Sequence, residues 1–171
     1  MEAFGMYQVG DYIVKASNGV CKVKAIVHPD FVSDKQKLYY LLTPVADENA
    51  NLYVPIDRGE ESARPVMTEK EAKDLVKKIP SIDATWINNE REREHNYKEA
   101  VQSNDPERLV GIIKLIYGRK KARAEQGKKT TAVDGRYYDT AERLLYSELE
   151  LAMHKNKDEI LAMIRDCCNA E

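Results

Sequence analysis

The chain has 171 residues, of which 43% are hydrophobic and 33% are charged, and its formal net charge is −2. This composition supports the cores of one domain or of two small domains, which excludes a disordered tail. The longest apolar runs span only a few residues, and the N-terminus carries acids where a signal peptide would carry bases. We therefore expect a cytoplasmic protein without a membrane segment.

Residues 1–66 have the pattern of a small β domain. Short segments rich in Val, Ile, Tyr and Leu alternate with turn residues. They predict five strands, at residues 11–16, 20–27, 37–45, 51–56 and about 64–67. Ser17-Asn18-Gly19 predicts a tight hairpin turn, because Asn and Gly tolerate the positive φ that such turns require. Five short strands suit a strongly bent sheet or an SH3-like barrel, and such a sheet can pair its open edge with a partner strand.

At Thr68 the hydrophobic period changes from that of strands to that of helices, and residues 67–171 predict an all-α domain of about five helices. Thr68 and Glu71 have the spacing of a capping box, and Pro80 is expected to end this first helix. The core face of the helix is expected to consist of Ala72, Leu75, Val76 and Ile79.

Four further helices are expected downstream. The second begins near Trp86 and contacts the core through Tyr97 and Val101, and the third begins at Pro106 after an Asp105 cap. A loop is expected at residues 128–135, before a strongly amphipathic fourth helix and a shorter fifth one. The apolar positions of these last two helices are Tyr138, Ala141, Leu145, Leu149, Ala152, Ile160, Leu161 and Ile164.

The strongest local charge lies in residues 114–129, where seven basic residues accompany one acid, Glu125. Apolar residues at helical spacing precede the bases, so this cluster is expected at the solvent-facing end of the third helix. Over the whole chain acids and bases nearly balance, and any nucleic-acid contact must therefore be local and sensitive to salt. The alternative is a solvated helix end followed by a mobile loop.

Trp86 is the only tryptophan of the chain. A single tryptophan often fills a core, and that interpretation stays open here. The flanking residues favour a different position, because turn and cap residues surround Trp86 and no clear apolar stripe includes it. These flanking residues are Pro80, Ser81, Asp83, Thr85, Asn88 and Asn89. An exposed indole beside a basic surface can stack on nucleic-acid bases or wedge between them.

The sequence contains no recognisable catalytic motif. His28, His95 and His154 do not lie beside a Ser or Cys in a nucleophile motif, and neither a phosphate-binding loop nor metal-ligand spacing is found. We therefore expect a protein that is not an enzyme and that has no cofactor or metal. The alternative is an enzyme whose catalytic residues are dispersed along the chain and form no local motif.

Cysteine usage fits the expected compartment. Cys21 stands alone, and Cys167 and Cys168 are adjacent, which is the spacing of neither a zinc site nor a disulfide framework. We expect these cysteines to have no functional role, and the alternative is that one of them is a reactive thiol.

Short motifs follow one another along the chain in a specific order. In the first part they are residues 7–14 (YQVGDYIV), Gly19-Val20, Tyr39-Tyr40-Leu41, Tyr53-Val54-Pro55 and Arg64-Pro65-Val66. In the second part they are Trp86, Asn96-Tyr97-Lys98, Ser103-Asn104-Asp105, Leu115 and residues 141–149 (AERLLYSEL). Their order and spacing over nearly all of residues 6–165 resemble the CarD/CdnL family of bacterial transcription regulators. The N-terminal module of that family is shared with the polymerase-binding domain of the transcription-repair coupling factor.

The resemblance implies a fold and two partners. Residues 1–66 would form a Tudor-like β domain that binds the β subunit of bacterial RNA polymerase through a sheet edge. The matching strand carries Leu52, Tyr53, Val54 and Pro55. Residues 67–171 would bind promoter DNA at the upstream edge of the transcription bubble, largely without sequence specificity, and Trp86 would wedge into the minor groove. The protein would thereby modulate the stability of the open complex. We expect a monomer, because no heptad repeat is long enough to demand a dimer.

The chain also departs from the family pattern. Arginines usually follow the tryptophan directly, whereas Ile87, Asn88 and Asn89 follow it here, and Arg91 and Arg93 come about one turn later. Phosphate contacts are then expected to shift toward the basic cluster. The candidate DNA-binding residues are Trp86, Arg91, Arg93, Arg119, Lys120, Lys121, Arg123, Lys128 and Lys129.

Residues 1–5 resemble no part of the family pattern and are expected to be a disordered start. The alternative function is an interaction adaptor that does not bind DNA and that buries Trp86 in its core.

Overall fold

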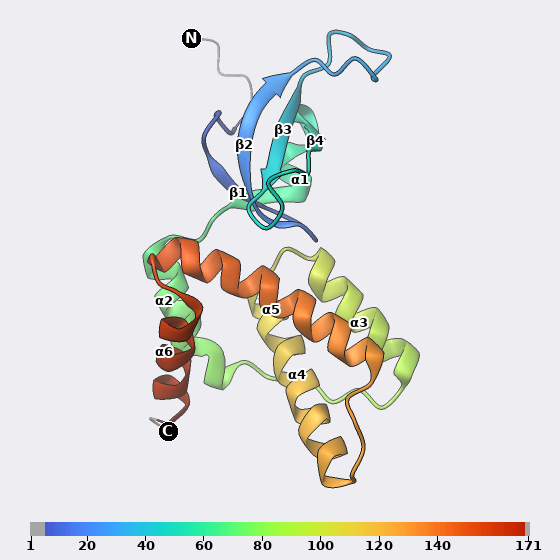
Figure 1. Ribbon diagram of the computed structural model, residues 1–171, viewed down its shortest axis with the longest axis vertical. Coiled ribbons are helices and arrows are strands. Elements are labelled where there is room, and N and C mark those ends of the chain that lie inside the picture. Colours follow the sequence, from blue (N-terminus) through green and yellow to red (C-terminus); the bar gives the residue numbers. More distant parts are fainter. Residues whose placement is uncertain (1–5, 170–171) are drawn as a thin grey trace. The chain divides into compact units, whose positions relative to one another are not determined.

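The chain divides into two units, Met1–Val66 and Met67–Glu171 (Figure 1). The computed structural model describes residues 6–169, without the side chains of Glu60 and Glu61. The disordered start expected at residues 1–5 therefore lies outside the described residues. None of the helices within residues 6–169 is long and apolar enough to cross a membrane.

The first unit is built on a five-stranded antiparallel sheet. Its strands are β1 (Tyr12–Lys15), β2 (Gly19–Val27), β3 (Tyr39–Pro44), β4 (Leu52–Pro55) and β5 (Ala63–Pro65). They lie in the order β4-β3-β2-β1-β5, and the pairing of β2 with β3 shifts register between Val23 and Ala25. Such a bulge bends a strand, and the sheet curls accordingly (Figure 1). The five predicted strands are confirmed, but the sheet is an open half-barrel with β4 and β5 as its edges.

Alternating side chains of these strands form the core of the first unit. Ile13, Val23, Tyr40 and Leu42 are almost completely buried, and the Tyr40 hydroxyl accepts a hydrogen bond from the Tyr7 amide at 3.1 Å. The hairpin between β1 and β2 lies where the sequence predicts it. Its positive φ angles, however, occur at Ser17 (67°) and Gly19 (79°), and not at Asn18.

A short helical segment between β4 and β5 was not predicted from the sequence. It consists of the 3-10 turn η1 (Ile56–Arg58) and the one-turn helix α1 (Gly59–Ser62). A Cβ atom at Gly59 would come within 3.0 Å of the Tyr40 ring. The segment can therefore approach the buried Tyr40 closely only because residue 59 lacks a side chain.

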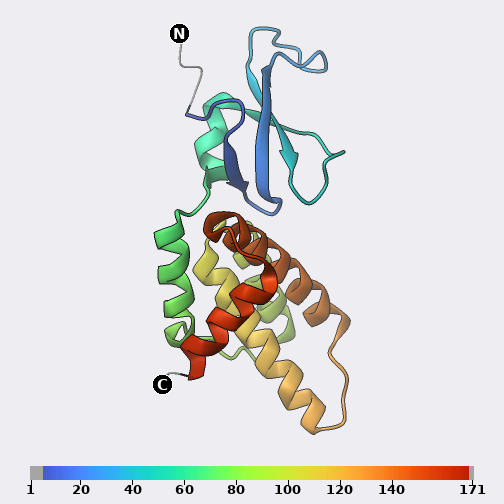
Figure 2. The same cartoon turned by 60° about the vertical axis from the view of Figure 1, so that its left-hand side comes forward.

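The second unit contains the five helices that the sequence predicts. They are α2 (Glu69–Lys78), α3 (Glu90–Gln102), α4 (Pro106–Glu125), α5 (Ala132–Met153) and α6 (Lys157–Asn169). The capping box of Thr68 and Glu71 is present, and a 3-10 turn, η2 (Ile79–Ser81), follows α2. Helix α5 contacts each of the other four helices, so its buried face forms the centre of this unit (Figure 2). The largest fully buried apolar residues of the second unit are Tyr97, Ile116, Leu149 and Ile160.

Two helix starts differ from the sequence prediction, and both differences arise from caps. Helix α3 begins at Glu90 and not near Trp86, because the Asn89 side chain accepts a hydrogen bond from the Glu92 amide. Helix α5 begins at Ala132, since Thr131 caps it in the same way through the Asp134 amide. The loop before α5 is therefore limited to residues 126–131, shorter than expected.

Candidate functional site

Trp86 lies in an irregular segment between η2 and α3, residues 82–88, which we call the Trp86 loop. The residue is 53% exposed, so the hypothesis that it fills the core is wrong. Its indole Nε1 donates a hydrogen bond to the Asn88 side-chain oxygen at 2.7 Å. The loop therefore presents most of an aromatic ring to solvent while satisfying its one polar atom.

Cations from two helices hold both ends of the Trp86 loop. At the start, the Lys114 ammonium donates to the carbonyls of Ile79, Pro80 and Ile82, at 2.9, 3.3 and 2.5 Å. At the end, Arg93 Nη1 donates to the carbonyls of Ile87 and Asn88, at 3.1 and 3.4 Å. Irregular backbone of this kind lacks regular partners, and these bonds supply them.

Arg93 has an internal position, although the sequence indicated a phosphate contact for it. Its side chain is 10% exposed, and its donors point toward the Trp86 loop and toward Asp134. The reason is helical spacing, because Arg93 lies four residues before Tyr97 and seven before Ala100, on the face that α3 buries. Arg93 is therefore a structural residue in this fold, and we remove it from the candidate DNA contacts.

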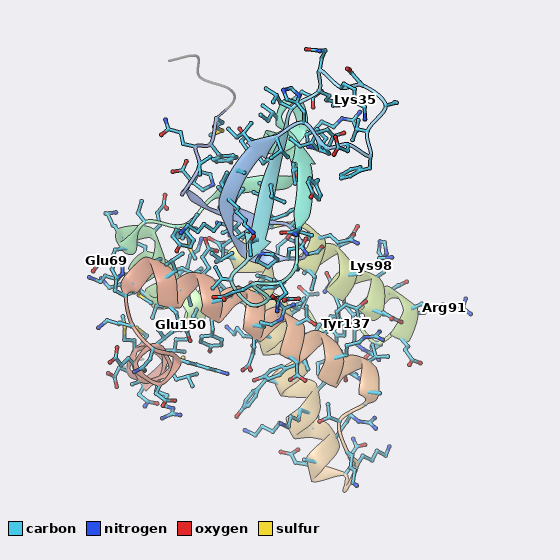
Figure 3. All side chains as sticks on the ribbon, turned by 45° about the horizontal axis from the view of Figure 1, so that its top comes forward. Lys35, Glu69, Arg91, Lys98, Tyr137 and Glu150 are labelled. Carbon is cyan, nitrogen blue, oxygen red and sulfur yellow. The ribbon has the colours of Figure 1, made fainter. Side chains whose placement is uncertain are left out.

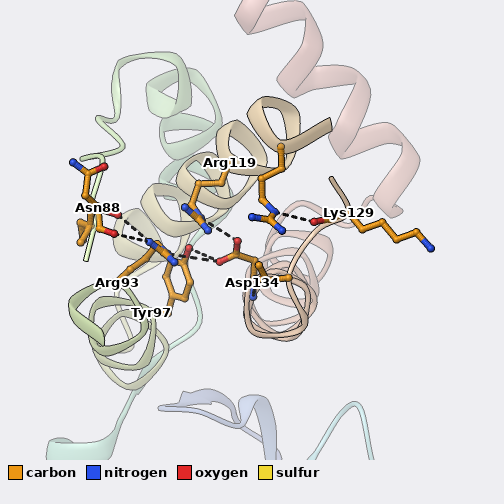
Figure 4. Close-up of polar contacts among 9 residues, drawn as sticks. Asn88, Arg93, Tyr97, Arg119, Lys129 and Asp134 are labelled. Carbon is orange, nitrogen blue, oxygen red and sulfur yellow. Dashed lines mark hydrogen bonds and ion pairs between the residues drawn. The ribbon is translucent and has the colours of Figure 1, made fainter. Parts of the chain in front are cut away.

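A buried carboxylate, Asp134, joins the three helices around this loop (Figure 4). The residue is 1% exposed and lies in the first turn of α5, where the helix dipole favours a negative charge. Its oxygens accept hydrogen bonds from the Tyr97 hydroxyl at 2.9 Å and from Arg119 Nε at 3.0 Å, and Arg93 Nε lies 4.0 Å away. Burial and the neighbouring carboxylate raise the pKa of the Tyr97 hydroxyl, so it remains a donor at neutral pH.

Arg119 connects this carboxylate to the exposed indole. Its guanidinium carbon lies 5.9 Å from the centre of the Trp86 ring, within the range of a cation–π contact. Its side chain is 12% exposed and pairs with Asp134, while the Trp86 ring lies beside its guanidinium. The tryptophan and the first arginine of the basic cluster thus form one local structure.

The remaining members of the basic cluster have two different positions. Arg123 is partly buried, and its Nε donates to the Lys129 carbonyl at 2.8 Å, which ties the loop at residues 126–131 to α4. Exposed bases comprise Lys120, Lys121, Lys128 and Lys129, together with Arg91, which projects outward from α3 (Figure 3). None of these five bases forms an ion pair with another residue in the described part of the chain. They are available to a polyanion.

In the first unit, the predicted polymerase-binding strand is an edge strand. β4 pairs with β3 alone in the described sheet, with Leu41 opposite Tyr53. Val54 is buried, Leu52 and Pro55 are partly buried, and Tyr53 is 40% exposed. The Tyr53 ring makes an edge-to-face contact with Phe31, with ring centres 4.9 Å apart.

Sequence reasoning missed two kinds of residue at these sites. Phe31, which is 68% exposed, lay in a segment that the pattern described only as a polar loop. Asp134 lay in the expected loop before the fourth helix, although Thr131 three residues earlier is a cap signal that could have corrected this.

A cavity of about 440 Å³ lies beside the Trp86 loop, between α3 and α4. Ile82, Ile87, Ile112 and Leu115 contribute apolar surface to it, and acidic residues line it as well. Within residues 6–169, no three His, Cys, Asp or Glu side chains are arranged to hold a metal ion.

The similarity to known proteins lies in the first unit. Residues 7–67 match the family model described as the CarD-like/TRCF RID domain. No curated protein matches the chain. The matched residues contain all five strands of the half-barrel, including the edge strand β4 and Phe31, whereas the helical unit lies outside them. The chain therefore carries, in residues 7–67, a CarD-like domain of the RNA polymerase-interacting type, in agreement with the order of its motifs.

Proposed function

We propose that this protein regulates transcription initiation by binding the β subunit of bacterial RNA polymerase and the promoter DNA at the upstream edge of the bubble. It works in the cytoplasm as a monomer, on DNA that the polymerase has already melted. The observation that carries the DNA half of the proposal is the exposed Trp86 ring, which lies beside Arg119 in the unit that also carries the exposed bases Arg91, Lys120, Lys121, Lys128 and Lys129.

The polymerase half rests on the edge strand β4. An edge strand offers unpaired backbone groups, and adding a partner strand satisfies them. Tyr53 faces outward from this strand and Val54 inward, so a docked strand would contact the Tyr53 side of the sheet. Phe31 extends that surface beside Tyr53. An aromatic pair at the centre of an interface typically contributes a large share of the binding energy.

The DNA half rests on the indole and on the exposed bases. An aromatic wedge inserted at a base step holds the step unstacked, and stacking on a base contributes about 1–3 kcal/mol. Lys120, Lys121, Lys128 and Lys129 would contact phosphates, which position the protein without reading the sequence. Bound in this way, the protein opposes rewinding of the melted DNA and lengthens the life of the open complex.

The experiment that tests this function measures the lifetime of open complexes on a promoter whose bubble is unstable. Bacterial RNA polymerase is assayed alone, with the wild-type protein and with the variant Trp86→Ala. We expect the wild type to lengthen the lifetime and the variant to return it to the value of polymerase alone. Binding to polymerase is measured separately and should be equal for the two proteins. Equal loss of polymerase binding and of the lifetime effect would contradict the wedge.

One observation favours a second function, that of a protein-interaction adaptor. The cavity beside the Trp86 loop is lined by three acids, Asp83, Asp105 and Glu107, and by one base, Arg108, and this excess of negative charge disfavours phosphates and suits a protein partner. Trp86 would then be an anchor for that partner. Protection of Trp86 from a neutral quencher by a forked DNA duplex favours the DNA function, and unchanged quenching at saturating DNA favours the adaptor.

A further inference from the structure

The structure assigns to Asp134 the role of positioning Trp86: its buried carboxylate holds Arg119 against the indole and Arg93 against the end of the Trp86 loop. Asp134 itself does not reach the indole, and it acts through these two arginines. The value of such positioning for DNA binding rests on the function proposed above, whereas the positioning itself is a property of the free protein.

The burial of the two arginines depends on Asp134. Their side chains are only 10% and 12% exposed, and a guanidinium in such a position needs an acidic partner. Asp134 lies within 4.0 Å of both, and no other ion pair of either arginine occurs among the described residues. Without the carboxylate, two like charges would remain close together in a poorly solvated site. Both side chains would then turn toward solvent.

Two separate routes lead from Asp134 to the indole. In the first, Arg119 Nε donates to Asp134, which orients the guanidinium whose carbon lies 5.9 Å from the Trp86 ring. In the second, Arg93 links Asp134 to the carbonyls of Ile87 and Asn88, and the Asn88 side chain accepts the indole N–H. Loss of the carboxylate therefore weakens both sets of contacts, those made through Arg119 and those made through Arg93.

A ring that is already fixed loses less conformational entropy when it inserts between bases. The contact between Arg119 and Trp86 is of the cation–π type, whose usual strength corresponds to about a two- to fivefold change in affinity. Variants that release the ring should therefore weaken binding to DNA by about this factor, while the exposed lysines still attract the phosphates.

Trp86 is the only tryptophan, so the fluorescence anisotropy decay of the full-length protein reports on this ring alone. Asp134→Asn removes the charge and keeps an oxygen that can accept the Tyr97 hydrogen bond. We expect a larger sub-nanosecond component in the anisotropy decay of this variant. Asp139→Asn, at an exposed position of the same helix, is the control and should leave the decay unchanged. Far-UV circular dichroism verifies that the helices persist.

Arg119→Lys provides an independent variant if Asp134→Asn fails to fold. Lysine keeps the charge, but its single ammonium cannot bond Asp134 and lie flat against an indole as a guanidinium can. The same fast component is expected. An anisotropy decay that matches the wild type in a folded Asp134→Asn or Arg119→Lys protein would overturn the role assigned to Asp134.

Affinity for a forked DNA duplex separates this inference from the proposed function. We expect both variants to bind the fork about two- to fivefold more weakly than the wild type, and Asp139→Asn to bind equally well. A wild-type protein that does not bind the fork would count against the proposed DNA function, and the anisotropy result would still decide the role of Asp134.

Discussion

The guanidinium carbon of Arg119 lies 5.9 Å from the centre of the Trp86 ring, although the two residues belong to different elements of the helical unit. The sequence shows a tryptophan and a basic cluster as two separate features. Their contact makes them parts of one surface, in which the aromatic ring and the bases can engage the same ligand. That surface, the sheet edge of the first unit and the packing that supports them can each be tested.

Trp86 should be accessible to acrylamide in the free protein and protected by DNA. The residue is 53% exposed, so a neutral quencher reaches the ring freely, whereas insertion between bases would shield it. Stern–Volmer constants measured with and without a forked duplex test this directly, and the constant should fall on the fork. A blunt duplex of the same length is the matched control and should protect less. Equal quenching on both DNAs would argue against insertion.

The double variant Lys128→Gln and Lys129→Gln should bind DNA more weakly and with less dependence on salt. Each lost phosphate contact lowers the slope of log K against log salt by about 0.9. Titrations at several salt concentrations give this slope. Lys70→Gln is the control, because this lysine is also exposed but pairs with Asp74 on α2. A slope that does not change in the double variant would remove these lysines from the interface.

Phe31→Ala should weaken binding to RNA polymerase, although Phe31 does not belong to the edge strand. Its ring supports Tyr53 by an edge-to-face contact, and truncating a central aromatic residue of an interface costs about 2 kcal/mol. Tyr53→Asp should weaken binding further, because it places a negative charge on the edge strand β4, where the polymerase is proposed to bind. Biolayer interferometry with intact polymerase measures both effects. Val45→Ala, at another exposed apolar position of the same unit, should bind like the wild type.

Thr68→Ala should destabilise the helical unit by about 1 kcal/mol, the usual cost of losing an N-cap side chain. The Thr68 hydroxyl accepts the Glu71 amide at 3.1 Å, and the Glu71 carboxylate accepts the Thr68 amide in return. Urea unfolding followed by tryptophan emission reports on this unit alone, since Trp86 is the only tryptophan. Lys98→Ala, an exposed change within α3, should leave the midpoint nearly unchanged. A larger shift for Lys98→Ala than for Thr68→Ala would refute the cap.

Two thiols should react quickly with Ellman's reagent at pH 8, and the third should not. Cys21 is fully buried, and this burial raises the pKa of its thiol to about 11. Because the thiolate is the reactive form, about one Cys21 in a thousand is ionised at pH 8, and the rate should rise as the pH approaches 11. Cys167 and Cys168 are partly or fully exposed and should account for the fast phase. Cys21→Ala should abolish only the slow phase.

Local sequence patterns were enough to predict most of the secondary structure and the family of the first unit. Short segments rich in Val, Ile, Tyr and Leu between turn residues marked the five strands, and helical spacing marked the five helices, because both signals depend on neighbours within a few positions. The capping box at Thr68 could be predicted for the same reason. The order of short motifs was sufficient to indicate the CarD-like domain that the family match shows for residues 7–67.

Which charges are available at the surface, by contrast, depends on how the helices pack. Arg93 lies one turn before Tyr97 on α3, so the packing that buries Tyr97 also turns Arg93 inward. The pairing of Arg93 and Arg119 with Asp134 joins three helices, and no local pattern encodes it. The contact of Phe31 with Tyr53 likewise depends on how a loop folds back on β4. Such contacts form between residues distant in sequence, and packing alone brings them together.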